Sequence, residues 1–281
     1  MNTNFIVNDY ALVWYLLFQA SISETIYKLK QKLWDTFKTE YNKTFNDRPS
    51  IITDKKDFIP NDDTIYNVFF ESKDYQKIKK QVEKYRIELM RIWDKNKKIT
   101  ENLYSKIIRK KTNDYTFFVV SNELEIIDVP TDDTAVIGIS IDKKDPLEYL
   151  LKLNMSLISN NTKKYDSIDE KIKQSIIELA VLNEYASNLY RRSCYLSGTP
   201  ELIELKRWLY PYWLMYLNVP KEELLSRMMR DKISFDVESY AYEKELKKMN
   251  IDEFIDFCIR NKKYIIRTKK EMVIKEDEEL L

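Results

Sequence analysis

The chain has 281 residues, of which 44% are hydrophobic and 33% are charged, enough apolar material for one large domain or two modest ones. Because it contains two glycines and no histidine, it excludes glycine-rich phosphate loops, imidazole catalysis and histidine-ligated zinc. The formal net charge of +1 gives no support for a nucleic-acid binder, although it does not prevent basic residues from gathering on one face.

The N-terminal part is predicted to be helical. Apolar side chains recur at helical spacing over 9–40, and "SISE" at 21–24 matches a capping box, which predicts a break or restart near Ser21. Residues 41–72 are polar and interrupted by proline, which predicts loops and one short strand in "TIYNVFF" at 64–70. The apolar positions over 9–40 are Leu12, Tyr15, Ile26, Leu29, Leu33, Trp34 and Phe37.

A long charged helix is predicted next, from about Asp74 to Lys110, and three strands follow it. The strands are β-branched and aromatic runs separated by short polar turns. The last run is apolar on both faces, which favours a central strand. The buried stripe of the helix is Ile78, Val82, Tyr85, Leu89, Ile92 and Trp93, and the strand runs are 115–121, 124–128 and 134–142.

The C-terminal half is predicted to be a series of helices, because cap and proline signals recur along it. The helix that begins at "SIDE" (167–170) is expected to run to about Arg191. Pro211 is expected to kink or end the helix that begins at Thr199. The tail from about Lys269 is expected to be frayed, charged surface. Further helix starts are predicted at Asp145-Pro146, at Pro220 and at Asn250–Glu253.

Together these elements predict an α+β fold, predominantly α-helical, with a small central three-stranded sheet at about 115–142 flanked by helices. The predicted organisation is an N-terminal helical segment with loops over 1–70 and a main helical domain with the inserted sheet over 71–268. A charged tail over 269–281 completes the chain.

The densest apolar run is "WLYPYWLMYL" at 208–217. Its aromatic and apolar residues cover most of the helix circumference, which is typical of a buried core helix. The run is far shorter than the roughly 18 apolar residues of a membrane span, and no other stretch approaches that length. Trp208 and Trp213 are therefore predicted to be buried, while a partner surface or a ligand pocket stays the alternative.

Carboxylates and a lysine gather around the last predicted strand, in the segment 126–144. This pattern resembles the PD-(D/E)-x-K nucleases. The resemblance implies that Asp133 and Asp142 hold Mg²⁺ and that Lys144 orients and polarises the attacking water, with Asp128 or Asp132 as other choices for the first carboxylate. The alternative interpretation is a polar turn followed by an aspartate at a strand end.

The stretch "NEYASN" at 183–188 is similar to the N-E-x-x-S-D segment of gluzincin metallopeptidases, with Asn188 where that family has aspartate. Residues 154–158, "NMSLI", occupy the places of the family's H-E-x-x-H motif and carry neither histidine nor the glutamate base. The resemblance therefore implies an inactive, zinc-less scaffold. Independently of it, Asn154 and Asn183 lie on apolar helix faces, which predicts buried asparagines whose hydrogen bonds join helices.

Basic clusters at 107–111 and 260–270 suit contacts with a phosphate backbone, and solvated helix ends explain them equally well. Two cysteines are too few for a disulfide framework, so a reducing, cytoplasmic location is expected. A composition rich in lysine and isoleucine and poor in glutamine favours a thermophile or one of its viruses.

The missing catalytic residue types and the near-neutral charge lead to one main functional prediction. We expect a non-catalytic interaction or regulatory protein, of viral or mobile-element origin, that binds a protein partner without a cofactor and without entering a membrane. The alternatives are a Mg²⁺-dependent nuclease that uses Asp128 or Asp133, Asp142 and Lys144, and the inactive gluzincin-like scaffold.

Overall fold

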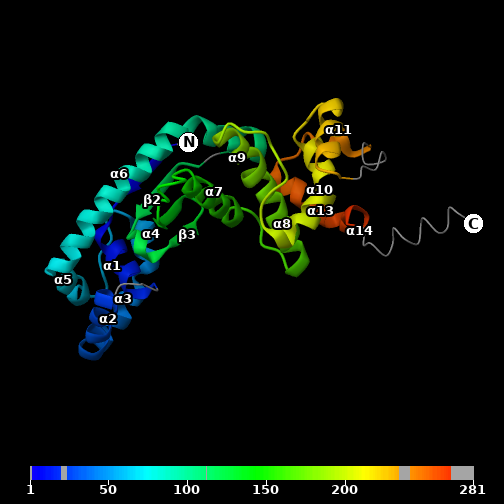
Figure 1. The fold of residues 1–281 in the computed structure, drawn as a ribbon. Helices are drawn as coiled ribbons and strands as arrows, with labels where there is room; N and C mark the ends of the chain where they lie inside the picture. The colour runs from blue at the N-terminus through cyan, green and yellow to red at the C-terminus, as the bar shows by residue number, and fades with distance from the viewer. Residues whose placement is uncertain (1, 20–23, 112, 234–240, 267–281) are drawn as a thin grey trace, which may run out of the picture. The chain divides into compact units, whose positions relative to one another are not determined.

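The computed structural model describes residues 2–19, 24–111, 113–233 and 241–266, and its elements form two compact units (Figure 1). Unit 1 consists of residues 1–97 and 113–157, and unit 2 of residues 98–112 and 158–281. Unit 1 carries one small sheet and several helices, whereas every described element that lies wholly in unit 2 is helical. The predicted α+β, predominantly α-helical fold is therefore confirmed. The predicted boundaries at residues 70 and 268 stay predictions.

The elements of unit 1 are β1 (Thr3–Ile6), α1 (Asp9–Phe18), α2 (Glu24–Thr36), α3 (Lys38–Asn46), α4 (Arg48–Asp54), α5 (Thr64–Phe70), α6 (Lys73–Asn102), β2 (Tyr115–Val119), the 3₁₀ turn η2 (Asn122–Leu124), β3 (Ile126–Thr131), β4 (Thr134–Gly138) and α7 (Glu148–Asn160). The last turns of α6 and α7 belong to unit 2. Unit 2 continues with the π-helical η1 (Leu103–Ile108), α8 (Ser167–Glu178), the π-helical η3 (Leu179–Tyr185), α9 (Ala186–Leu189), the 3₁₀ turn η4 (Pro200–Leu202), α10 (Ile203–Tyr216), α11 (Lys221–Arg230), α12 (Glu243–Leu246), α13 (Ile251–Arg260) and α14 (Lys262–Ile265).

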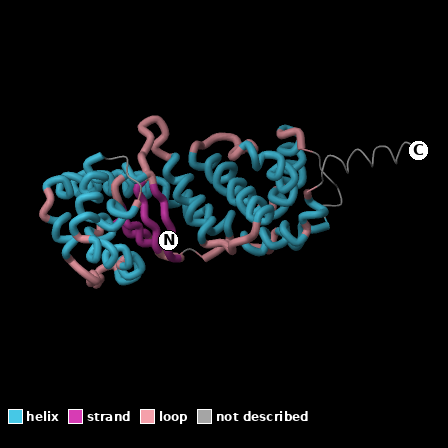
Figure 2. The backbone as a smooth tube through the Cα atoms, turned by 90° about the horizontal axis from the view of Figure 1, so that it is seen from below, coloured by secondary structure: helices cyan, strands magenta, loops and turns pink. Residues whose placement is uncertain are grey.

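The sheet has the strand order β1-β2-β4-β3, and Figure 2 shows its strands gathered in one place among helices. β1, β2 and β4 run parallel, and β3 runs antiparallel to β4. All residues of β4 are buried, which confirms the predicted central strand. The prediction of three strands missed β1, whose pairing partner begins far along the chain, Thr3 opposite Tyr115.

One face of the sheet packs against the long helix α6. Phe5, Phe117 and Ala135 stand opposite one another on neighbouring strands and therefore point to the same face. The ring of Trp93 on α6 lies 6.0 Å from Phe5 and 5.3 Å from Phe117, centroid to centroid. This aromatic contact fixes α6 on the sheet.

On the opposite face of the sheet lie α1 and α4. Phe118, Val136 and Asp128 share a register position, so they point away from α6. Asp128 accepts a hydrogen bond from Tyr15 of α1 and pairs with Arg48 of α4. The sheet of unit 1 is therefore a central layer with helices on both faces.

The predicted long helix is confirmed, whereas the predicted strand at 64–70 is wrong. Val82, Tyr85, Leu89 and Trp93 of the predicted stripe are buried, while Ile78 and Ile92 are half-buried. Residues 64–70 form the helix α5 instead of a strand. Short apolar runs fit both periods, and the buried positions of α5 have helical spacing, namely Ile65, Tyr66 and Phe69.

The aromatic run at 208–217 forms most of α10 and lies in the core of unit 2. Trp213 is fully buried, and Tyr216 stacks on Phe254 of α13 with 4.6 Å between ring centroids. Pro211 lies inside α10 without ending it, because the helix continues to Tyr216. Trp208 is half-buried, so the prediction of burial holds fully for Trp213 only.

Helix starts that rest on local side-chain chemistry are mostly as predicted. α11 begins directly after Pro220. α13 begins with a capping box, in which Asn250 accepts the N–H of Glu253 and the Glu253 carboxylate accepts the N–H of Asn250. The predicted capping box at 167–170 is wrong, because α8 follows Asp166, whose side chain caps no N–H group.

Two other predicted features fall on residues whose placement is not described. Residues 21–23 of the "SISE" stretch and the tail from Lys269 lie outside the described residues.

A buried ion pair anchors the loop between α9 and α10. Lys206 and Glu178 are both buried and pair directly. The Lys206 ammonium also donates to the carbonyl of Ser197 (2.8 Å), and the Glu178 carboxylate accepts the N–H of Thr199 (3.0 Å). Gly198, which lies between Ser197 and Thr199, has a φ of +122°, and a Cβ there would lie 2.4 Å from the Lys206 nitrogen. The loop therefore needs glycine at this point.

Candidate functional site

The first predicted carboxylate, Asp128, is held by its neighbours in unit 1. Its Oδ2 accepts the hydroxyl of Tyr15 (2.8 Å) and pairs with the guanidinium of Arg48. Burial and the charge of Asp128 raise the pKa of Tyr15, which keeps the phenol protonated as a donor. The contacts of Asp128 with Tyr15 and Arg48 join β3 to α1 and α4.

The other residues of the nuclease alternative are distributed along β4. Asp133 directly precedes this strand, and Asp142 lies four residues beyond its end. The five residues of β4 span about 17 Å, at about 3.3 Å per residue. Ser140 still lies at the far end of the strand, because its N–H bonds to Glu125 just before β3. The structure therefore does not bring Asp133 and Asp142 together.

Both aspartates accept hydrogen bonds from other residues of the chain. Asp133 accepts hydrogen bonds from Thr131 (2.7 Å), Thr134 (3.0 Å) and Lys55 (3.3 Å), and the Thr131 bond contributes most to lowering its pKa. Asp142 accepts the backbone N–H of Lys144 (2.8 Å), which is an Asx turn.

Within the described residues, no three His, Cys, Asp or Glu side chains form a group that could hold a metal ion. The nuclease alternative stays a prediction, and the described geometry adds no support to it.

The two predicted asparagines are buried, but their hydrogen bonds do not join helices. Asn154 donates to the carbonyl of Leu150 (2.8 Å) within α7. Asn183 donates to the carbonyl of Tyr195 in the loop after α9. The prediction of burial is confirmed. The prediction of helix-to-helix hydrogen bonds is wrong, because both amides donate to backbone carbonyls, one in the same helix and one in a loop.

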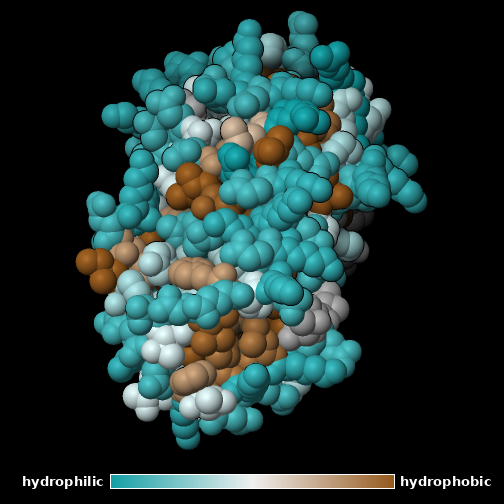
Figure 3. Space-filling model, turned by 90° about the vertical axis from the view of Figure 1, so that its left-hand side faces the viewer, coloured by the Kyte–Doolittle hydropathy of each residue, from teal (hydrophilic) through white to brown (hydrophobic). Residues whose placement is uncertain are grey.

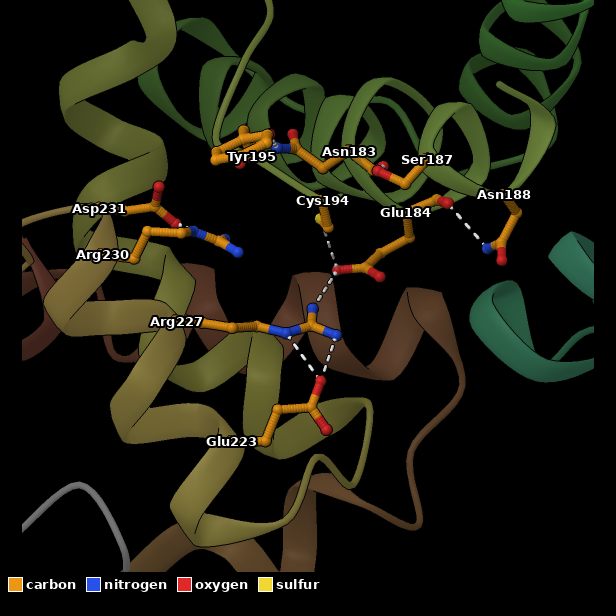
Figure 4. Close-up of polar contacts among 10 residues, drawn as sticks. All are labelled: Asn183, Glu184, Ser187, Asn188, Cys194, Tyr195, Glu223, Arg227, Arg230 and Asp231. Atoms are coloured by element: carbon orange, nitrogen blue, oxygen red, sulfur yellow. Dashed lines mark hydrogen bonds and ion pairs between the residues drawn. The ribbon is translucent and has the colours of Figure 1, made fainter. Parts of the chain in front are cut away.

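The "NEYASN" segment begins in η3 and ends in α9, and its glutamate is the centre of a polar cluster in unit 2 (Figure 4). Glu184 Oε1 accepts hydrogen bonds from Arg227 of α11 (3.2 Å) and from the thiol of Cys194 (3.5 Å). Arg227 also donates twice to Glu223, at 3.0 and 2.7 Å. Glu184 lies within the stretch that resembles the gluzincin segment, whereas Arg227 and Cys194 carry no sequence signal that links them to it.

Cys194 is not an activated thiol. Burial, followed by the charge of Glu184, raises its pKa to about 12. The thiol is therefore protonated at neutral pH, and the thiolate needed for nucleophilic attack or metal binding is scarce. The Glu184 cluster has no nucleophile of this kind. The gluzincin-like alternative stays a prediction.

Beside Glu184 lies a cavity of about 410 Å³ that is formed within unit 2. Both π-helical segments contribute to it, with Leu103, Lys106 and Ile107 from η1 and with Glu184 and Tyr185 from η3. The remaining lining residues are Ile99, Asn102, Asn188, Leu217 and Val219.

A second candidate is a set of aromatic side chains at the surface of unit 1, which we call the aromatic patch (Phe18, Trp34, Tyr41 and Phe45). Phe18 lies 5.1 Å from Phe45 and 5.0 Å from Tyr41, and Tyr41 lies 5.3 Å from Trp34, all between ring centroids. Trp34 is 41% exposed and Phe45 is 55% exposed. The sequence predicts Trp34 on the buried face of its helix, and the structure corrects this prediction.

Figure 3 shows hydrophobic side chains gathered at the surface in the lower part of the view. Contiguous exposed apolar patches mark interaction surfaces, whereas single exposed hydrophobic side chains are normal.

No protein family, no curated protein and no solved structure matches this chain. None of the described helices combines the length and the apolar character that a transmembrane span needs.

Proposed function

We propose that the protein is a non-catalytic interaction protein and that the aromatic patch of unit 1 binds a protein partner. The observation that carries this proposal is the unbroken series of ring contacts that links the exposed Trp34 to the exposed Phe45 through Tyr41 and Phe18. Aromatic side chains are enriched in the cores of protein interfaces, and Trp and Tyr are enriched among the few residues that dominate the binding energy.

Contacts within the protein itself hold the side chains of the aromatic patch in place. The ring of the buried Trp14 stacks on the ring of Phe45, with 6.2 Å between the ring centroids. The Lys38 ammonium lies 5.3 Å from the ring centroid of Trp34. Rings that are fixed by such contacts lose little conformational entropy on binding. A preorganised aromatic surface therefore favours binding of a partner.

A protein partner is also favoured over nucleic acid, because several of the predicted phosphate-binding side chains are engaged within unit 2. Arg109 donates to four backbone carbonyls, Lys110 pairs with Asp252, and Lys262 pairs with Asp169. Cytoplasmic location, a thermophilic host and a viral or mobile-element origin fit this proposal and rest on composition alone.

The test is an affinity capture from the natural host with matched variants. The double variant Trp34→Ala/Phe45→Ala removes the two exposed rings, while Ile59→Ala is the control, because Ile59 is an 85% exposed hydrophobic residue that is not part of the patch. We expect one partner that the wild type and Ile59→Ala retain and that the double variant binds at least about tenfold more weakly.

Circular dichroism and thermal unfolding of the double variant establish that it is folded. If every protein captured by the wild type is captured equally by the folded double variant, the aromatic patch is not the binding surface.

A further inference from the structure

The cavity beside Glu184 is bordered by two π-helical segments. η1 contributes Leu103, Lys106 and Ile107, and η3 contributes Glu184 and Tyr185. π-helical turns are rare, well under about 1% of residues, and they concentrate at functional sites. The volume of about 410 Å³ falls in the range of small-molecule sites, roughly 300–1,000 Å³.

Two opposite charges line this cavity without pairing with each other. Among the described residues, no carboxylate pairs with the Lys106 ammonium, and no donor reaches Oε2 of Glu184. Oε1 of Glu184 is the atom that binds Arg227 and Cys194, so the carboxylate is held in place by one oxygen and the other oxygen is left open. A ligand that carries both charges would complete both groups.

The surroundings of Glu184 keep a negative charge at this end of the cavity. Glu184 and Glu223 share the single guanidinium of Arg227, so one of the two negative charges is not compensated within this cluster (Figure 4). A ligand ammonium group is therefore attracted to the Glu184 side, and a ligand carboxylate to Lys106.

Apolar side chains form part of the wall. Leu103 is fully buried, and Leu217 and Val219 follow the end of α10. Asn188 donates its amide to the carbonyl of Glu184 (2.9 Å), which leaves its own carbonyl oxygen as an acceptor beside the cavity. The lining thus combines an apolar wall with polar groups of both signs.

We propose that this cavity binds a small zwitterion with an aliphatic portion, an α-amino acid with a branched side chain. Its carboxylate pairs with Lys106, its ammonium group donates to Glu184 Oε2, and its side chain packs against Ile107, Leu217 and Val219. This inference is independent of the aromatic patch, because the patch belongs to unit 1 and the cavity to unit 2.

The test is calorimetric titration of the full chain with L-leucine and with two analogues that each lack one charge. Leucinamide lacks the carboxylate, and 4-methylpentanoate lacks the ammonium group. We expect each analogue to bind at least about tenfold more weakly than leucine, because a hydrogen-bonded charge contact is lost in each case.

Matched variants assign each charge to its residue. Lys106→Gln should weaken leucine about tenfold and leave leucinamide unchanged, and Glu184→Gln should weaken leucine about tenfold and leave 4-methylpentanoate unchanged. Lys98→Gln, an exposed position two turns earlier on the same stretch of helix, is the control and should bind leucine as the wild type does.

Three results would overturn the proposal. One is no binding of leucine by the wild type up to about 10 mM. Another is an analogue that binds the wild type as tightly as leucine does. This comparison uses no variant, so it does not depend on whether Glu184→Gln folds. The last is a loss of leucine binding in Lys98→Gln equal to that in Lys106→Gln. A failed leucine titration leaves the proposal for the aromatic patch untouched.

Discussion

The hydroxyl of Tyr85 on α6 donates a hydrogen bond to the carbonyl of Ile139 (2.5 Å) and accepts one from the N–H of the same residue (3.1 Å). Ile139 directly follows β4, where strand pairing ends, so one buried side chain satisfies both of its backbone groups. The end of the central strand is thus fixed by the helix that packs on it.

Tyr85→Phe should lower the free energy of unfolding by about 1–3 kcal/mol, because the buried N–H and C=O of Ile139 lose their partner. Urea unfolding followed by fluorescence measures the change. Tyr210→Phe is the control, because Tyr210 is also buried and its hydroxyl has no hydrogen-bond partner among the described residues. Equal stabilities of the two variants would contradict this role of Tyr85.

The buried Lys206–Glu178 pair predicts a large effect of removing one partner. Lys206→Met should cost about 3–5 kcal/mol, because it leaves the carboxylate of Glu178 buried and unpaired. Adding Glu178→Gln removes that charge while keeping an acceptor for the N–H of Thr199, and should recover part of the loss. Denaturant midpoints of the single and double variants check this, and a double variant no more stable than Lys206→Met would contradict it.

Arg109 predicts a specific requirement for a guanidinium. Its two terminal nitrogens donate to the carbonyls of Lys247 (2.8 Å), Met249 (3.2 Å) and Tyr216 (2.6 Å), and its cation lies 4.4 Å from the ring centroid of Tyr216. Arg109→Ala should destabilise the protein by about 2–4 kcal/mol, and Arg109→Lys should not restore the loss, because an ammonium cannot reproduce the fork geometry. Thermal unfolding is the measurement, with the exposed Lys111→Ala as the neutral control.

The raised pKa of Cys194 predicts slow alkylation. The ordinary thiol pKa is about 8.5, and burial together with Glu184 raises it to about 12 in the folded chain. The neutral thiol therefore favours the folded state below about pH 8.5, and this contribution is lost as the pH rises towards 12. Iodoacetamide at pH 8 should label Cys194 much faster in urea than in the folded protein.

Glu184→Gln should accelerate that reaction in the folded state, because removal of the carboxylate charge lowers the pKa of the thiol. Mass spectrometry locates the label. Cys258 is the internal control, because full burial raises its pKa and labelling there reports unfolding. A rate that does not change in Glu184→Gln would show that the carboxylate does not act on the thiol.

The parts of the fold that were predictable depend on local chemistry. Asn250 and Glu253 form their capping box with each other, and the fixed φ of Pro220 suits the start of α11. Neither helix start depends on residues that are distant in the sequence. β1 was missed for the opposite reason, because its pairing with β2 joins Phe5 to Phe117. Strand pairing over such a separation leaves no pattern in four residues.

The candidate sites were harder to predict than the elements. Helical periodicity assigns Trp34 to a buried face, and only the packing of α3 beside it shows that the ring is exposed and touches Tyr41. The π-helical turns of η1 and η3 are invisible to a period of about 3.6 residues. The contact of Glu184 with Arg227 joins segments 43 positions apart, and no spacing rule connects them.

The way in which the chain is divided between the two units has a consequence for producing fragments of it. Because residues 98–112 belong to unit 2 and are followed by more of unit 1, the polypeptide passes between the units three times, after residues 97, 112 and 157. A fragment that ends at 157 would carry the apolar side chains of η1 without their partners, and a fragment that starts at 158 would lack them. Neither half is obtained by a single cut, so a fragment of either unit has to be built from two separate stretches of sequence joined by a linker.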